Sequence, residues 1–306
     1  MSLRVKRPGG HGDAGASEPA SARSAPLGDV IVDAIEVQAG QRFASRRVSF
    51  EREVAGARPR SAPDDVLRLC HVAKSFGALV ALRDINLHLR AGEALGLIGE
   101  NASGKSTLLK IVAGFHSPDA GQLVVRGTPV DLKGVGHARS LGIDCVYQDL
   151  ALIDELSVWQ NISLSRETVH QRLPLLARRR MRAVARDALD DLGVRVDSVD
   201  VSVAHLSRGQ RQAIALARSI HSASDILLLD EPIAALGAKE AATMMSVLAR
   251  LRERSPISII FVAHVFGHVL EVCDRVNLIE NGCIALDKPT SDTSIQELTD
   301  VLLRGL

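Results

Sequence analysis

The sequence predicts an α/β protein with a mostly parallel core sheet, an antiparallel β part and a helical insertion. From Val66 onward, short apolar strands alternate with amphipathic helices, an alternation typical of parallel sheets whose strands are joined by helices. Hydrophobic residues make up 46% of the 306 residues, so the chain can bury a sizeable core. A long stretch of helical periodicity interrupts the alternation at about 149–215.

The N-terminal residues differ in composition from the rest. Residues 1–62 are rich in Gly, Ala, Ser, Pro and Arg and show little sustained periodicity. We expect them to be a disordered extension and residues 63–306 to form one domain. Ser45–Phe50 resembles a twin-arginine export signal, but the charged residues 51–53 stand where such a signal needs an apolar run. A basic linker is the better interpretation.

The expected elements follow from the spacing of the apolar residues. Strands are expected at Val66–His71, Ile85–Leu89, Glu93–Ile98, Gln122–Arg126, Ile143–Tyr147, Ile226–Asp230, Ile257–Val262, Arg275–Ile279 and Cys283–Asp287. Helices are expected from Gly104 and at Arg178–Leu192, Arg208–His221, Lys239–Arg254 and Phe266–Cys273. Residues 152–223 are expected to be almost entirely helical, and Asn281-Gly282 indicates a tight turn.

Charge and cysteine content narrow the function classes. The net charge of +1, from 37 basic and 36 acidic residues, gives no reason to expect a nucleic acid or an acidic membrane surface as partner. The run Arg178–Arg182 begins an amphipathic helix, which favours a solvated face over a nucleic-acid site. The four cysteines form no CxxC pair, so we expect free thiols in a reducing compartment. No stretch approaches the roughly 18 apolar residues of a membrane-spanning helix.

A phosphate-binding loop is predicted between an apolar strand and a helix. Gly99–Ser106 fits the pattern G-x-x-x-x-G-K-[ST]. Backbone N–H groups of such a loop, together with the positive end of the following helix, bind phosphate groups. We expect Lys105 to reach the outer phosphates of ATP and the Ser106 hydroxyl to coordinate Mg²⁺. The expected nucleotide contacts in this loop are Gly99, Glu100, Asn101, Ala102, Ser103, Gly104, Lys105, Ser106 and Thr107.

Two adjacent carboxylates end a buried strand further along the chain. Ile226–Leu229 is continuously apolar and is followed by Asp230 and Glu231. Charges at such a position need a cation or a metal as partner. We expect Asp230 to hold Mg²⁺ through water and Glu231 to orient or deprotonate the attacking water. A surface acidic pair that caps the turn at Pro232 is the alternative.

A third motif shows a resemblance to a known family. Leu206-Ser207-Arg208-Gly209-Gln210 resembles the L-S-G-G-Q signature of the nucleotide-binding subunits of ABC transporters. With the two preceding motifs, the resemblance extends over about Val66 to Asp287. It implies a P-loop NTPase fold of the ABC type. It also implies that Ser207, Gly209 and Gln210 contact the ATP that a second subunit holds.

The resemblance assigns further roles by position. Phe76 matches the aromatic residue on which adenine stacks, with a core phenylalanine as the alternative. Gln148 matches a glutamine that contacts Mg²⁺ and water, and His264 matches the switch histidine that contacts the γ-phosphate. Residues 234–237 match the loop that contacts the partner subunit. The expected catalytic residues are Glu231, His264 and Gln148, and the expected metal ligands are Ser106, Gln148 and Asp230.

Within the family, the chain is most similar to the sugar-import branch. This similarity rests on the residues Tyr147–Val158, Asn161-Ile162 and 234–237. The resemblance implies a homodimer or a pairing with another ABC subunit, an integral-membrane permease and an exported sugar-binding protein, with no nucleic acid as partner. It places the chain peripherally on the cytoplasmic face of the bacterial inner membrane.

Three positions depart from the family pattern. Ala102 stands where glycine is common, which costs ~1 kcal/mol if its backbone is left-handed. Arg208 replaces the first glycine of the signature, and Ile233 replaces a common threonine. Arg208 and Ala102 leave open a regulatory ABC-type ATPase with little turnover. A non-transport ABC-type protein is the other alternative, although the 102 positions from Lys105 to Ser207 leave no room for a long coiled coil.

Overall fold

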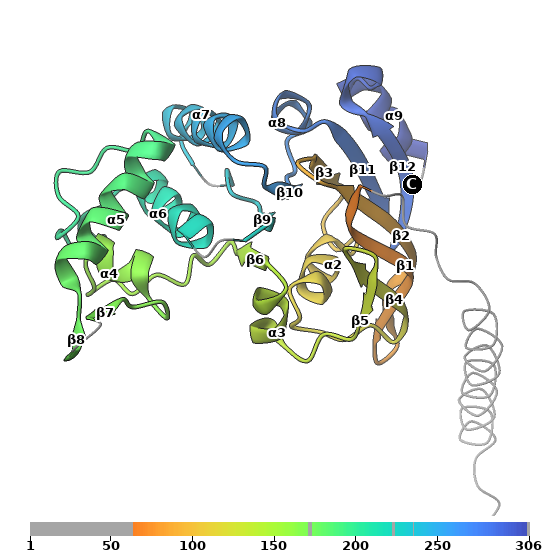
Figure 1. Cartoon of the computed structure of the whole chain (residues 1–306). Helices are drawn as coiled ribbons and strands as arrows, with labels where there is room; N and C mark the ends of the chain where they lie inside the picture. The colour runs from red at the N-terminus through yellow and green to blue at the C-terminus, as the bar shows by residue number, and fades with distance from the viewer. Residues whose placement is uncertain (1–63, 171–172, 222–223, 235, 305–306) are drawn as a thin grey trace, which may run out of the picture. The chain divides into compact units, whose positions relative to one another are not determined.

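The computed structural model describes residues 64–304 except for 171–172, 222–223 and 235 (Figure 1). The extension predicted at residues 1–62 lies outside the described residues, so the domain boundary stays a prediction.

A ten-stranded sheet runs through the described part of the chain in the order β5-β4-β1-β2-β12-β11-β3-β10-β9-β6. Its strands are β1 (Asp65–Phe76), β2 (Leu79–Arg90), β3 (Ala94–Ile98), β4 (Ala120–Val125), β5 (Thr128–Val130), β6 (Ile143–Val146), β9 (Ile226–Asp230), β10 (Ser258–Val262), β11 (Arg275–Glu280) and β12 (Cys283–Pro289). The five strands from β11 to β6 are parallel neighbours, while β1, β2, β4 and β5 pair antiparallel. The predicted fold class is therefore confirmed.

Helices cover the parallel strands and fill the insertion. They are α2 (Lys105–Val112), α3 (Val135–Ser140), α4 (Val158–Ser163), α5 (Arg178–Leu192), α6 (Arg208–His221), α7 (Ala238–Arg254), α8 (Phe266–Val272) and α9 (Ile295–Arg304). The predictions for α5 and α6 are confirmed at both ends, whereas α3 and α9 were not predicted. No described helix is both long and apolar enough to span a bilayer. All four cysteines are free, as expected.

The core sheet is buried on both faces. Successive side chains of a strand point to opposite faces. Leu95 and Leu97 of β3 accordingly pack in the cluster that contains α2, whereas Ala94 and Ile98 pack in the cluster that contains α7 and α8. Figure 1 shows α2 and α3 on one side of these strands and α7 and α8 on the other. Burial on two faces explains why the sequences of these strands are continuously apolar.

One prediction for the insertion was wrong. The strands β7 (Val169–His170) and β8 (Leu173–Leu176) form a small antiparallel hairpin within the stretch expected to be helical. Pro174 lies in this hairpin, and proline has no N–H to donate within a helix. The rest of the insertion, including α4, α5 and α6, is helical as expected.

The tight turn between β11 and β12 braces the phosphate loop. Asn281 and Gly282 have φ angles of 48° and 76°, as a two-residue hairpin turn of this kind requires. The Gly282 N–H donates to the Ser103 carbonyl at 3.1 Å, and its carbonyl accepts from the Arg83 N–H at 2.9 Å. A Cβ atom at Gly282 would lie 2.8 Å from the Ala81 carbonyl oxygen. The turn is thus pressed against β2 and the loop together.

Replacement of Gly282 by alanine tests this bracing. Gly92 is a matched control, because its φ of 71° is similar but a Cβ atom there would meet nothing within 4 Å. Both alanine variants incur the cost of a left-handed backbone, about 1–2 kcal/mol. Only Gly282→Ala should lose about 1–3 kcal/mol more through the close contact. Thermal unfolding measures this, and equal losses of Tm in the two variants would show that the turn is not braced.

Candidate active site

The predicted site residues of the core sheet follow neighbouring strands. The loop Gly99–Thr107 follows β3, His264 follows β10, Asp230 and Glu231 lie at the end of β9, and Gln148 follows β6. The pairs β3–β10, β10–β9 and β9–β6 are parallel, so all four strands end at the same edge of the sheet. The structure therefore brings these residues together at one edge.

Two non-glycine residues of the site have a left-handed backbone. Ala102 has φ 63° and Glu231 has φ 52°. Ala102 was expected to be strained if its backbone is left-handed, and the structure shows that it is. The expected cost is ~1 kcal/mol. The Glu231 N–H donates to the Val262 carbonyl at 3.1 Å, which holds this turn against β10. Strain of this kind clusters at functional sites.

Lys105 lies inside the phosphate loop with only 5% of its surface exposed. Its ammonium donates to the carbonyl oxygens of Gly99 at 2.8 Å and Glu100 at 2.5 Å. Burial lowers the pKa of Lys105, and the nearby carboxylates Glu231, Asp230 and Glu100 act in the opposite direction. The protein therefore compensates the charge of Lys105, the first residue of α2, only in part. We expect phosphate groups of the nucleotide to supply the rest.

The carboxyl group of Asp230 also lacks full compensation. Burial raises its pKa and the adjacent Glu231 raises it further, while nearby cations including Lys105 lower it. The described residues contain no cluster of three or more His, Cys, Asp or Glu side chains that could hold a metal. Mg²⁺ suits such a site, because it binds one or two carboxylates and keeps water and phosphate oxygens as its other ligands. Ser106 and Gln148 are exposed at the same edge of the sheet, and their side-chain oxygens are further candidate ligands.

His264 and Glu231 contact each other directly. The Nε2 atom of His264 forms a hydrogen bond with Oε1 of Glu231. The side chain of Glu231 is 17% exposed and that of His264 is 38% exposed, so both face an accessible edge. A carboxylate held by a ring nitrogen in this way has a defined orientation toward solvent, as a general base requires.

The signature residues form the start of α6. The Ser207 N–H donates to Gln210 Oε1 at 3.0 Å, and the Gln210 N–H donates to Ser207 Oγ at 3.3 Å, so the two form a capping box. Gln210 Nε2 also donates to the Arg195 carbonyl at 3.1 Å. A Cβ atom at Gly209 would lie 3.3 Å from Cβ of Glu240 on α7. None of these hydrogen bonds reaches the phosphate loop of the same chain.

Phe76 ends β1 and is 44% exposed, which does not fit the alternative of a core residue. Its ring contacts His116 edge-on, with centroids 5.3 Å apart. The Lys74 ammonium lies 5.5 Å from the Phe76 centroid. An accessible ring of this kind can stack on a base, and adenine stacking at Phe76 stays a prediction.

A link that was not predicted from the sequence joins α6 to the segment after Gln148. Arg211 forms an ion pair with Asp154. Arg218 donates to the carbonyl oxygens of Leu150 and Ala151, both at 2.8 Å. Arg211 and Arg218 are seven positions apart and so lie on one face of the helix. That spacing is a sequence signal, but it does not identify the acceptors.

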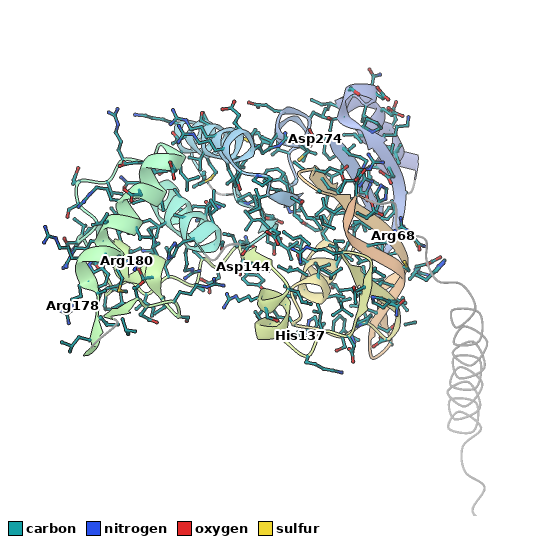
Figure 2. The ribbon with its side chains drawn as sticks, viewed as in Figure 1. Arg68, His137, Asp144, Arg178, Arg180 and Asp274 are labelled. Carbon is teal, nitrogen blue, oxygen red and sulfur yellow. The ribbon has the colours of Figure 1, made fainter. Side chains whose placement is uncertain are left out.

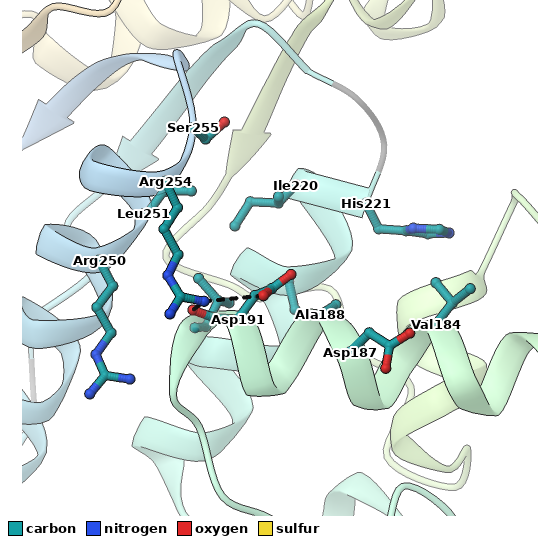
Figure 3. A pocket seen from close by; sticks show the side chains of 12 residues that line it. Val184, Asp187, Ala188, Asp191, Ile220, His221, Arg250, Leu251, Arg254 and Ser255 are labelled. Atoms are coloured by element: carbon teal, nitrogen blue, oxygen red, sulfur yellow. Dashed lines mark hydrogen bonds and ion pairs between the residues drawn. The ribbon is translucent and has the colours of Figure 1, made fainter.

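A separate cavity of about 450 Å³ lies between α5, α6 and α7 (Figure 3). Asp191 and Arg254 form an ion pair of 3.1 Å at its edge. None of the predicted site residues lines this cavity. It is therefore not part of the edge where the phosphate loop and the carboxylates meet.

Comparison with known proteins agrees with this geometry. The family model described as ABC transporter matches residues 82–234, half of the chain. That range contains the phosphate loop, the signature and the two carboxylates that end β9.

Curated relatives match over most of the described chain. The xylose/arabinose import ATP-binding protein of Sulfolobus acidocaldarius is 38% identical over 238 residues, which are 78% of this chain and 94% of that protein. The ribose import ATP-binding protein of Hahella chejuensis is 33% identical over 240 residues, which are 78% of this chain and 47% of that protein. The chain thus spans about half the length of the ribose import relatives that it matches.

Solved structures show the same fold. The cbiO1 protein of Clostridium perfringens, part of an ABC transporter complex, is 27% identical with a TM-score of 0.67, over 79% of this chain and 96% of that one. The ATP-binding cassette MJ1267 has a TM-score of 0.66 over 78% of this chain and 95% of that one, and its 23% identity shows the fold alone. From its family match, its curated relatives and its fold, the chain belongs to the ABC transporter family and is an ATPase.

Proposed function

We propose that this ATPase energises the import of a monosaccharide through a membrane permease. The observation that carries the proposal is the gathering of the phosphate loop, Asp230, Glu231 and His264 at one edge of the sheet, where hydrolysis needs them. Relatives named for xylose/arabinose import and for ribose import, similar over 78% of the chain, support the substrate class. A subunit with little turnover is less well supported, because each of these groups is present and lies at the same edge of the sheet.

The roles of the site residues follow from their positions. Lys105 and the loop amides hold the outer phosphates of ATP, and Ser106, Gln148 and Asp230 hold Mg²⁺. Bound Mg²⁺ neutralises charge on the phosphates. Glu231 orients or deprotonates the attacking water, and the hydrogen bond from His264 fixes the direction of its carboxylate.

A second subunit completes the site in this proposal. Among the residues that the structure describes, the signature forms no hydrogen bond with the phosphate loop of its own chain. The N–H groups of Ser207 and Gln210 are used within the capping box, so the Ser207 hydroxyl and the Gly209 N–H are the donors that we expect to face another molecule. We infer a head-to-tail homodimer, or a pairing with another ABC subunit, in which Ser207 and Gly209 of one chain contact the ATP of the other. The side chain of Gln210 supports this segment by closing the capping box with Ser207.

The link between α6 and the segment after Gln148 suggests how the site communicates with a permease. Arg211 and Arg218 join the signature helix to residues 150–154. A shift of Gln148 on nucleotide binding would therefore be transmitted to the helical insertion, where we propose that the permease docks. The chain then lies peripherally at the cytoplasmic face of the membrane, and an exported sugar-binding protein delivers the solute to the permease.

Glu231→Gln tests the paired site. The amide keeps the size of the side chain but cannot accept the proton, so ATP should bind and persist. We expect a stable dimer in saturating Mg-ATP and monomers without nucleotide, as measured by sedimentation velocity. A variant that stays monomeric in saturating Mg-ATP would contradict the paired site.

The same substitution tests the substrate class. Cells whose only copy of this chain is the Glu231→Gln variant should lose the uptake of a labelled monosaccharide, with xylose, arabinose and ribose as the first candidates. Cells that carry the parent chain are the control. Undiminished uptake of all three sugars in the variant would contradict the proposed import of a monosaccharide. It would not contradict the conclusion that the chain is an ATPase.

Asp230→Asn separates stability from activity. The raised pKa means that the charged carboxylate opposes folding above its ordinary pKa. The variant should therefore have a higher Tm than the parent at pH 7 without nucleotide, and this gain should be lost as the pH falls below about 4, where the carboxyl group becomes protonated in the unfolded state as well. Its Mg²⁺-dependent ATP hydrolysis should fall about 100-fold or more.

The exposed Asp300→Asn is the matched control, because it removes one negative charge from α9, which carries none of the predicted site residues. It should change neither Tm nor turnover appreciably. A lower Tm for Asp230→Asn than for the parent at pH 7 would show that the charged carboxylate of Asp230 stabilises the fold, which contradicts its raised pKa.

A further inference from the structure

An apolar and basic surface lies where the β7–β8 hairpin meets the start of α5. We call it the hairpin surface, and it consists of Val169, Leu175, Leu176, Arg178, Arg179 and Arg180. The three aliphatic side chains are 57%, 59% and 42% exposed, respectively. Figure 2 shows Arg178 and Arg180 at the end of α5 that adjoins β8. The ATPase site does not use these residues, and neither does the link formed by Arg211 and Arg218. The hairpin surface belongs to the same helical insertion on which we propose that the permease docks.

The charge of this surface is not balanced locally. From Leu175 to Arg186 the sequence carries five arginines and no carboxylate. Arg182 pairs with Asp200 at 2.6 Å and lies 5.0 Å from the centroid of Trp159, so its charge already has partners within the protein. All three arginines at 178–180 are exposed, and none has a hydrogen-bond or ion-pair partner among the described residues. The overall net charge of +1 gives no indication of this local excess of positive charge.

The position of these arginines opposes the stability of α5. The first turn of the helix contains no acidic residue, and Ala177 provides no side-chain cap. Cations at a helix N-terminus are unfavourable, because the helix dipole makes that end positive. The segment is nevertheless fixed in place, since the Ala177 N–H donates to the Thr168 carbonyl at 2.7 Å and Met181 is buried. An anionic partner would relieve this repulsion.

We propose that the hairpin surface binds the anionic headgroups of a phospholipid bilayer. Guanidinium groups pair with lipid phosphates, and aliphatic side chains beside them enter the boundary between headgroups and acyl chains. The exposed apolar side chains favour a bilayer over a nucleic acid, because single-stranded nucleic acid is held by stacking on aromatic rings and the hairpin surface has none. This contact goes beyond the permease-mediated attachment proposed above and does not need a permease.

Binding of the full chain to vesicles tests the proposal. We expect the parent chain to co-sediment with vesicles of phosphatidylcholine and phosphatidylglycerol far better than with phosphatidylcholine alone. Removal of one arginine charge near an anionic surface weakens binding about fivefold. The variant R178Q/R179Q/R180Q should therefore bind the anionic vesicles about 100-fold more weakly. The conservative variant R178K/R179K/R180K should retain binding to within about tenfold.

Two further variants complete the experiment. Arg90, Lys133 and Arg254 are exposed elsewhere, and their triple glutamine variant removes the same charge but should bind like the parent. Leu175→Ser with Leu176→Ser should weaken binding without changing its dependence on salt. ATP hydrolysis without vesicles should be equal in the parent and R178Q/R179Q/R180Q, which verifies folding and keeps this test separate from the proposed transport function.

The results that would overturn the proposal are equally definite. They are equal binding of the parent to neutral and anionic vesicles, or parent-like binding of R178Q/R179Q/R180Q to the anionic ones. In either case the three arginines would serve another anionic partner, such as an acidic protein segment, or none.

Discussion

The buried ammonium of Lys105 is the group on which the rest of the site depends. It donates to two carbonyl oxygens of its own loop, and burial lowers its pKa. The pKa of Asp230 is raised for the same reason. Opposite charges thus lie near each other at a desolvated edge, and neither is fully satisfied by the protein. A triphosphate with Mg²⁺ supplies both missing partners, so the charges of the site are arranged for its ligand rather than for the empty fold.

The sheet and its turns place the other predicted catalytic and metal-binding residues at the same edge as Lys105. Parallel strands that are buried on both faces end at a common edge, so residues distant in sequence are brought together there. Glu231 and His264 meet in this way across neighbouring strands. The turn at Gly282 contacts the loop through the hydrogen bond from its N–H to the Ser103 carbonyl. The signature helix stands apart, and this separation is why the proposed site needs a second subunit.

Much of this arrangement is readable from the sequence, for identifiable physical reasons. Continuous apolar runs mark strands buried on two faces, and regular periodicity gave both ends of α5 and α6. The hairpin at 169–176 was missed, because strands this short carry too little periodicity to outweigh their helical neighbours. The ion pair of Arg211 with Asp154 was missed as well, since it joins residues far apart in sequence. An averaged net charge likewise gave no sign that Arg178 and its neighbours lack local partners.

Equilibrium binding of Mg-ATP to the full chain tests the central claim most directly. Lys105→Ala removes the buried ammonium, and Lys133→Ala removes an exposed one outside the site as a control. We expect Lys105→Ala to bind Mg-ATP at least about 100-fold more weakly, since buried charge-assisted contacts of this kind are worth about 3 kcal/mol or more, whereas Lys133→Ala should stay close to the parent. Parent-like affinity of Lys105→Ala would contradict the account.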